Sequence, residues 1–329
     1  MAEKKLNWGI LSTARINRAL MKPLRGSARN QLLAVASRNL TSASTYAREQ
    51  NIPRAYGGYE DLLADADIDV IYNPLPNHLH AEWSVKALRA GKHVLCEKPL
   101  ALTLADVDAM SAASKETGKI IAEAFMYRHH AQTLKVKEMI DSGALGKLQL
   151  IKGAFTFTLS RQGNFRYVKE FGGGSIWDVG CYPISYARML AGAEPLEVFG
   201  WQTASAAGCD DSFVGQMRFP NGVYAQFDSG FTSPFRAYME VIGSEAALYI
   251  PTPFKPSLKN EVLLKRGGEE EKIIISGGEL YSGEVEDLCD AILLGKPPRV
   301  SLTDSRANVA AILALIESAQ SGKPVLLNS

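Results

Sequence analysis

The sequence predicts a doubly wound α/β domain at the N-terminus, followed by an α+β domain built on an open, mainly antiparallel sheet. Three observations lead to this fold class. The first ~125 residues alternate short apolar runs with longer amphipathic segments, whereas strand-like runs dominate the chain after Gly146. In addition, 329 residues are too many for one ordinary compact core and indicate two domains.

Five apolar runs in the first part of the chain are predicted to be parallel strands, over residues 6–11, 31–37, 69–73, 92–96 and 120–124. Apolar residues at helical spacing predict the helices between them, over residues 12–25, 40–51, 79–90 and 104–117. Gly91 and Gly118 follow two of these helices as C-terminal caps, because glycine adopts the left-handed conformation at low cost. This alternation predicts a Rossmann domain over residues 1–125.

The second part of the chain contains strand-like runs separated by turn residues, which predicts a sheet. Strands are predicted over residues 147–159, 196–202, 213–219, 223–231, 238–242 and 272–275. Turn signals such as Pro220-Asn221-Gly222 separate them, and helices over residues 283–294 and 304–321 close the chain. We assign residues 126–329 to this second domain, and we expect the last helices to be able to pack back on the first.

The composition excludes several classes of function. With 36 basic and 35 acidic residues, the chain offers no broad positive field for nucleic acid. No stretch approaches the ~18 consecutive apolar residues of a membrane span, and the polar start of the chain has no secretion signal, so we expect a cytoplasmic protein. The four cysteines form no CxxC pair and no histidines stand four residues apart, so no metal site is expected.

A phosphate-binding turn is predicted directly after the first strand, formed by Ser12, Thr13, Ala14, Arg15 and Ile16. A G-x-G-x-x-G fingerprint would place glycines at positions 12, 14 and 17, where this chain has serine, alanine and asparagine. Small residues can partly replace glycine where backbone N–H groups and a helix N-terminus approach a pyrophosphate. The alternative is an ordinary strand-to-helix turn capped by Ser12 or Thr13.

The end of the second strand decides between the two nicotinamide dinucleotides. An NAD enzyme usually has a carboxylate there for the ribose 2′-hydroxyl, but this chain has Ser37 and Arg38. Arg38 can clamp a 2′-phosphate with charge-assisted hydrogen bonds and stack on adenine, while the Ser37 hydroxyl adds a further bond. We therefore expect NADP(H) to be preferred over NAD(H), the alternative being a solvated arginine in a loop.

Three later segments resemble those of the Gfo/Idh/MocA family of oxidoreductases. They are NPLPNHLH at residues 73–80, CEKP at residues 96–99 and GGGSIWDVGCY at residues 172–182. The resemblance covers essentially the whole chain. Tyr182 at the end of the third segment is similar to the tyrosine-type branch of the family, near dimeric dihydrodiol dehydrogenase and the NADP-dependent xylose dehydrogenases.

The resemblance implies a set of site residues. In the family, the lysine matching Lys98 points into the active site, and the proline matching Pro99 lies against the nicotinamide, often after a cis peptide bond. The same comparison places Pro74, Asn77, His80 and Glu97 at the cofactor crevice, although Asn77 and His80 could instead cap a helix. Arg128 and Arg166 match segments that border the substrate pocket.

The expected chemistry is reversible hydride transfer between C4 of the nicotinamide and a carbinol carbon of a cyclic sugar or related polyol. Tyr182 would move the proton, Lys98 would stabilise its phenolate, and Asp178 would orient the lysine or bind a substrate hydroxyl. Tyr182 could alternatively be a core residue and Asp178 a helix cap. A trans-dihydrodiol substrate and a non-catalytic NADP-binding regulator are the alternative functions. We expect a homodimer or homotetramer formed through the open face of the second sheet.

Overall fold

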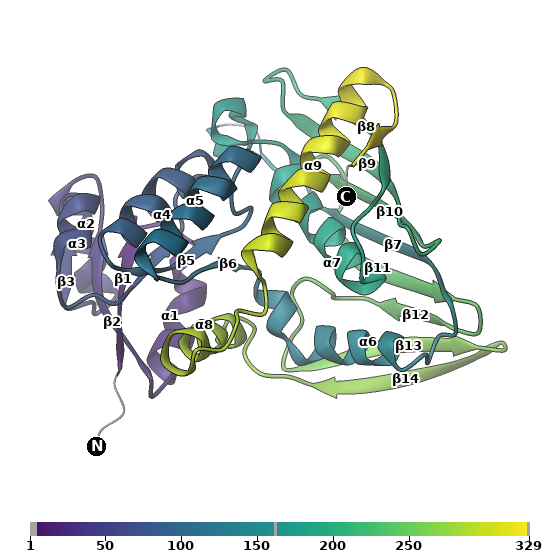
Figure 1. Cartoon of the computed structure of the whole chain (residues 1–329), viewed down its shortest axis with the longest axis horizontal. Helices are drawn as coiled ribbons and strands as arrows, with labels where there is room; N and C mark the ends of the chain where they lie inside the picture. Colours follow the sequence, from purple (N-terminus) through teal and green to yellow (C-terminus); the bar gives the residue numbers. More distant parts are fainter. Residues whose placement is uncertain (1–4, 161–162, 328–329) are drawn as a thin grey trace. The chain divides into compact units, whose positions relative to one another are not determined.

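The computed structural model describes residues 5–160 and 163–327, which form two compact units (Figure 1). The first unit extends to His129 and also includes Tyr281–Arg306. The second unit consists of His130–Leu280 and the segment that begins at Ala307. The segment from Tyr281 to Arg306 thus belongs to the unit formed by the N-terminal part of the chain.

The sheet of the first unit is fully parallel, with the strand order β3-β2-β1-β4-β5-β6. Its strands are β1 (Leu6–Leu11), β2 (Asn30–Ala36), β3 (Arg54–Tyr56), β4 (Val70–Asn73), β5 (His93–Glu97) and β6 (Ile121–Ala124). Consecutive strands run outward from β1 in one direction and from β4 in the other. Ligands of such sheets bind beyond the carboxyl ends of the strands at this switch point. The predicted Rossmann arrangement is confirmed.

Helices connect these strands: α1 (Asn17–Gly26), α2 (Leu40–Glu49), α3 (Tyr59–Ala64), α4 (His80–Arg89) and α5 (Leu104–Thr117). The bounds of α5 follow from its sequence. The Thr103 side chain accepts a hydrogen bond from the Asp106 N–H, and Gly118 ends the helix in the left-handed conformation. Helix α8 (Ser282–Leu294) adds to the same core through Val285 and Leu288, and Arg29 forms ion pairs with Glu286 and Asp290 of this helix.

The second unit contains a nine-stranded sheet in the order β14-β13-β12-β11-β7-β10-β9-β8-β15. Its strands are β7 (Leu148–Thr156), β8 (Glu197–Ala204), β9 (Asp210–Arg218), β10 (Tyr224–Gly230), β11 (Arg236–Gly243), β12 (Ala247–Ile250), β13 (Lys259–Arg266), β14 (Glu269–Ser276) and β15 (Val325–Leu326). All neighbours pair antiparallel except β7 and β10, which are parallel. The predicted open, mainly antiparallel sheet is therefore confirmed.

Helices lie along one face of this sheet: α6 (Ala131–Asp141), α7 (Cys181–Ala191) and the second-unit part of α9 (Leu302–Ser321). The covered face buries alternate strand residues such as Phe213 and Ala225. On the other face of the same strands, Trp201, Val214 and Tyr224 are exposed. The sheet thus presents apolar side chains on a side that no element of the described second unit covers.

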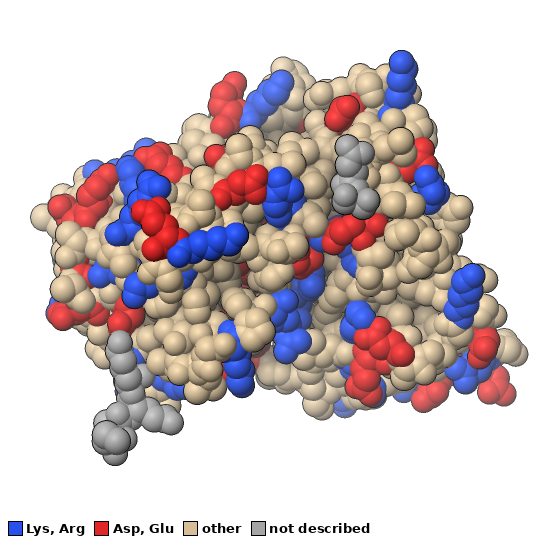
Figure 2. Space-filling view, viewed as in Figure 1, with Lys and Arg blue, Asp and Glu red and all other residues tan. Residues whose placement is uncertain are grey.

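On the face shown in Figure 2, acidic and basic side chains are interspersed rather than gathered by sign. None of the helices in the described part of the chain is long and apolar enough to cross a membrane. Within residues 5–160 and 163–327, no group of three or more histidine, cysteine, aspartate or glutamate residues could hold a metal ion. All four cysteines are buried as free thiols.

Candidate active site

The turn after β1 contains a residue in the left-handed conformation although it lacks glycine. Ser12 has a φ of 74°, in the left-handed region where the first glycine of the fingerprint normally stands. Its N–H donates to the Ala36 carbonyl over 2.8 Å, and its carbonyl accepts from Nδ2 of Asn17 over 3.0 Å. Its Oγ accepts from the Ala14 N–H over 3.2 Å. Neither Ser12 nor Thr13 is the N-cap of α1, which is Ile16 and forms no side-chain cap. That this turn binds a phosphate stays a prediction.

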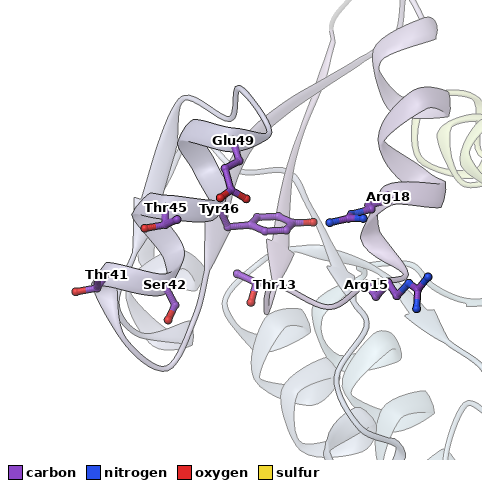
Figure 3. A pocket seen from close by; sticks show the side chains of 8 residues that line it. All are labelled: Thr13, Arg15, Arg18, Thr41, Ser42, Thr45, Tyr46 and Glu49. Carbon is purple, nitrogen blue, oxygen red and sulfur yellow. The ribbon is translucent and has the colours of Figure 1, made fainter.

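Beside this turn lies a cavity of about 590 Å³ between the start of α1 and one face of α2 (Figure 3). It is lined by Thr13, Arg15, Arg18, Thr41, Ser42, Thr45, Tyr46 and Glu49. Guanidinium and hydroxyl groups are the donors that bind phosphate oxygens, and the two arginines outweigh the single carboxylate. In Figure 3 the Tyr46 hydroxyl points toward Arg18.

The sequence prediction included only Thr13 and Arg15 of this lining. The hydroxyls of Thr41, Ser42 and Thr45 stand at helical spacing on α2, which is a signal in the sequence, but only the fold brings that face next to α1. Ser37 and Arg38 lie outside the lining, at the carboxyl end of β2, where Ser37 is half-buried and Arg38 exposed. Burial raises the pKa of Tyr59 on α3, and the nearby positive charge of Arg38 offsets part of this increase.

The turn after β5 carries Lys98 and Pro99, joined by a cis peptide bond as the family resemblance implies. Three neighbouring elements hold this turn. From β4, the Tyr72 hydroxyl donates to Oε1 of Glu97 over 2.7 Å. From β6, Oε1 of Glu123 accepts from the N–H of Leu100 over 2.9 Å. Glu97 is therefore tied to the sheet by its side chain, while Lys98 lies half-buried between two fixed residues.

The third support is His80, at the start of α4. Its ring nitrogens lie 2.8 Å from the Pro99 carbonyl oxygen and 2.7 Å from that of Leu75. Burial lowers the pKa of His80 to about 4, so the imidazole is neutral at pH 7 and donates its single N–H to one of the two carbonyls. His80 is fully buried, and its ring supports the turn. Its place at the cofactor crevice stays a prediction.

Asn77 and Pro74 belong to the same loop. Asn77 opens a short 3-10 turn (Asn77–Leu79) and is half-buried, whereas Pro74 is buried. Leu79 is the N-cap residue of α4, and both ring nitrogens of His80 face loop carbonyls, so the helix-cap alternative for His80 is wrong. The role of Asn77 stays a prediction. The second turn of interest, Met126–His129, carries Arg128, which is buried and forms an ion pair of 3.1 Å with Asp304.

In the second unit, Asp178 and Tyr182 stand on one continuous helical segment. It opens with a π-helical turn, Ile176–Gly180, and continues as α7. Such π turns are rare and frequent at functional sites. Tyr182 is 5% exposed and lies among aromatic rings, with ring centroids 5.5 Å from those of Phe155 and Phe254.

Asp178 is brought together with Arg166, which stands in the 3-10 turn Phe165–Tyr167. Nε of Arg166 donates to Oδ2 of Asp178 over 2.6 Å, and both side chains remain partly exposed. The sequence predicted both residues for the site but not their pairing. Gly173 lies between these two residues in the sequence. This position requires glycine, because a Cβ there would lie 2.5 Å from the Arg166 carbonyl oxygen.

Comparison with known proteins assigns the chain to a family. Residues 6–125 match the model of an oxidoreductase family with an NAD-binding Rossmann fold, and residues 133–249 match the GFO/IDH/MocA C-terminal domain. The chain belongs to the GFO/IDH/MocA family. It is an oxidoreductase, as the residues of its three motifs predicted.

The chain is 34% identical to the D-xylose 1-dehydrogenase (NADP(+)) 2 of Haloferax volcanii over 98% of this chain and 99% of that one. Its fold is similar to an aldose-aldose oxidoreductase from Caulobacter crescentus solved with glycerol, with a TM-score of 0.92, 27% identity and coverage of 98% and 100%. It is also similar to a 3-ketoreductase from Actinomadura kijaniata solved with NADP and TDP-benzene, with a TM-score of 0.91, 29% identity and coverage of 96% and 98%. Solved variants of that enzyme replace a lysine and a tyrosine.

Proposed function

We propose that the protein is an NADP(H)-dependent oxidoreductase that transfers a hydride to or from a carbinol carbon of a cyclic sugar. One observation carries this proposal. Lys98, on the supported turn after β5, and Tyr182, on the helical segment after the π turn, are separated by the same number of residues as the lysine and tyrosine replaced in the Actinomadura 3-ketoreductase. The xylose dehydrogenase and the aldose-aldose oxidoreductase, both matched over nearly their full length, are named for sugar substrates, whereas dihydrodiol dehydrogenases of Xenopus, matched over 91–93% of this chain, support the alternative substrate.

The first unit fits a dinucleotide with a 2′-phosphate. The left-handed Ser12 lets the backbone turn sharply before α1, whose N-terminus favours an anion. We assign the pyrophosphate to this turn, residues 12–16. The 2′-phosphate is assigned to the region of Ser37, Arg38 and the arginine-lined cavity, since no carboxylate follows β2 to bind a ribose hydroxyl.

When bound, the nicotinamide supplies or accepts the hydride; the protein must move the accompanying proton. We assign this transfer to Tyr182, whose hydroxyl donates a proton to the carbonyl oxygen in reduction and whose phenolate accepts the proton of the substrate hydroxyl in oxidation. A free phenol is a poor base near pH 7, because its pKa is about 10. The Lys98 ammonium is assigned to the same oxygen, where a positive charge stabilises both phenolate and alkoxide.

The Arg166–Asp178 pair is assigned to the sugar. A guanidinium offers donors and a carboxylate offers acceptors, so together they can recognise neighbouring hydroxyl groups of a ring. Their partial exposure leaves the pair accessible in the second unit. Arg128 is better suited to supporting the site than to binding substrate, because it is buried against Asp304.

The activity test follows absorbance at the nicotinamide band. The protein is incubated with NADP and a panel of aldoses, cyclic polyols and a trans-dihydrodiol. We expect reduction of NADP with at least one aldose, with a higher kcat/KM than for the dihydrodiol. A protein that binds NADP but oxidises the dihydrodiol far better than any sugar would contradict the assigned substrate class.

We also propose that the protein is a homodimer or homotetramer assembled through the outer face of the second-unit sheet. Trp201 and Tyr224 are each 54% exposed on that face, which is costly for large apolar side chains in contact with water. Light scattering at micromolar concentration is expected to give a dimeric or tetrameric mass. A monomeric mass would contradict this assembly.

A further inference from the structure

A buried carboxylate from the sheet grips the start of the π-helical turn. Asp210 is the first residue of β9, and its side chain lies beneath the segment that carries Asp178 and Tyr182. Its Oδ2 accepts a hydrogen bond from Oγ of Ser175 over 2.5 Å and another from the N–H of Ile176 over 2.9 Å. These are the residue before the turn and the first residue of the turn, so Asp210 fixes where the turn begins.

The neighbouring strand, β10, contacts both ends of the same turn through Ser229. Its Oγ lies 3.0 Å from Oγ of Ser175 at the beginning. At the end of the turn, a Cβ on Gly180 would lie only 3.0 Å from the same Oγ atom. Asp210 and Ser229 are therefore hydrogen-bonded at the beginning of a five-residue turn, Ser229 also packs closely at its end, and Asp178 lies in the middle.

The glycine before Ser175 lies so close to the Asp210 carboxylate that no side chain could replace its hydrogen. Gly174 has a φ of 119°, which L side chains rarely adopt, and a Cβ there would lie 2.1 Å from Oδ1 of Asp210. The close approach explains the last glycine of the triplet without reference to a ligand. It also means that the carboxylate and the backbone of the segment cannot move independently.

Holding the turn with a buried carboxylate costs desolvation free energy. Burial raises the pKa of Asp210 to about 6, and the hydrogen bonds from Ser175 and Ile176 offset this only in part. At pH 7 Asp210 is thus mainly a buried anion whose desolvation opposes folding. Buried charged groups of this kind are retained in some proteins because they specify one arrangement over its competitors.

We propose that Asp210 is a positioning residue of the active site, which selects the π turn over a regular α-helix and so sets the direction of Asp178 and Tyr182. A regular helix turns by about 100° per residue, so a change of one residue in the register would point these side chains elsewhere. The proposal rests on the catalytic role assigned to Tyr182 above.

The first test is structural and does not depend on the substrate. In a crystal structure of Asp210→Ala, we expect the turn to lose its π character and the distance between Nε of Arg166 and Oδ2 of Asp178 to exceed hydrogen-bonding range. An unchanged turn in this variant would overturn the proposal whatever the enzyme acts on. If the alanine variant does not fold, Ser175→Ala provides the same test, because it removes one of the two bonds to Asp210.

The second test is kinetic. Asp210→Ala is expected to lower kcat at least tenfold with NADP affinity within twofold of wild type, since the cofactor turn lies in the other unit. Asp210→Asn should recover most of kcat, because its amide oxygen still accepts from the Ile176 N–H. Asp228→Ala is the matched control, as this aspartate on β10 pairs with Arg236 at an exposed position. Equal kcat in Asp210→Ala and the control would overturn the proposal.

Discussion

Arg166 and Asp178 form a hydrogen-bonded ion pair, with Nε and Oδ2 2.6 Å apart, at the point where a 3-10 turn meets the π-helical turn. The arginine and aspartate side chains are 31% and 17% exposed. Partly exposed ion pairs contribute on the order of 0–1 kcal/mol to stability. The pair therefore adds little to stability, and the substrate-binding role proposed for it above is open to a direct test.

Substitution of Arg166 tests its part in recognition. Arg166→Ala removes the donors of the pair, so KM for the sugar is expected to rise at least tenfold, about 1.4 kcal/mol of lost binding. The affinity for NADP should change less than twofold. Arg218→Ala, which removes another partly exposed ion pair of the second unit, is the control. A KM for Arg166→Ala equal to that of the control would remove the pair from the substrate site.

The phosphate turn gives a prediction about stability. Ser12 adopts a left-handed φ of 74°, which costs a non-glycine residue roughly 1 kcal/mol. Ser12→Gly relieves this cost, whereas Ser12→Ala keeps it and loses the bond to the Ala14 N–H. We expect the glycine variant to be more stable than the alanine variant by about 1 kcal/mol in urea unfolding, with NADP affinity preserved. A more stable alanine variant would show that the turn is not strained.

The cofactor preference depends on the arginines of the first unit. NADP should bind at least tenfold more tightly than NAD, about 1.4 kcal/mol, because only NADP offers a 2′-phosphate. Arg38→Ala and Arg18→Ala are tested separately by titration with both dinucleotides, with Arg48→Ala as control, since Arg48 is exposed on α2 and does not line the cavity. Loss of the preference in either variant identifies the partner of the phosphate. Equal affinity of the wild type for NAD and NADP would refute the assignment.

Glu123 gives the stability a pH dependence. Burial raises its pKa to about 7 from an ordinary value of 4.5. The folded state thus holds the proton more tightly than the unfolded state, so this group lowers stability progressively as the pH rises from about 4.5 to 7. Glu123→Gln removes the charge while keeping an acceptor for the Leu100 N–H. We expect the variant to gain stability over wild type by an amount that grows across this pH range, on the order of 3 kcal/mol. A constant difference from pH 5 to 8 would contradict the raised pKa.

Local signals made much of the fold predictable. The helix from Leu104 to Thr117 was predicted with its observed bounds from its apolar spacing and from Gly118, which ends it; the Thr103 cap was found in the structure. Strand β3 and helix α3 were not predicted, nor were helices α6 and α7 and strands β12, β13 and β15 of the second unit. Arg54–Tyr56 is only three residues long, and its strand conformation depends on pairing with β2. Strand bounds elsewhere shifted by a few residues for the same reason.

The residues of the candidate site were predictable where they stand in short sequence motifs. They were not predictable where their contacts depend on how the chain packs. The CEKP segment identified Lys98 and Pro99, but the support from His80 requires the fold, since its ring reaches two loops. The π turn could not be predicted, because Asp210, which holds it, lies 35 residues further along the chain. The arginine-lined cavity likewise combines residues of two helices, α1 and α2, with the turn before α1.

The central claim is that Tyr182 moves the proton and that Lys98 assists it. Tyr182→Phe keeps the ring between Phe155 and Phe254 but lacks the hydroxyl, so the fold and NADP binding should survive. Removing a positioned acid or base typically lowers the rate by about 10²–10⁴. Lys98→Met should lower kcat by on the order of a hundredfold while leaving NADP affinity within a few fold.

The most direct test is the pH dependence of kcat for sugar oxidation in wild type, Lys98→Met and Tyr182→Phe. Wild-type kcat should rise with pH to a plateau, because in oxidation the Tyr182 phenol must be deprotonated to accept the proton from the substrate hydroxyl. In Lys98→Met the rise should move to higher pH, since the charge that stabilises phenolate is gone. In Tyr182→Phe the rise should disappear, together with most of the activity. A Tyr182→Phe variant with near-normal kcat and the wild-type profile would assign the proton transfer to another group and contradict the account.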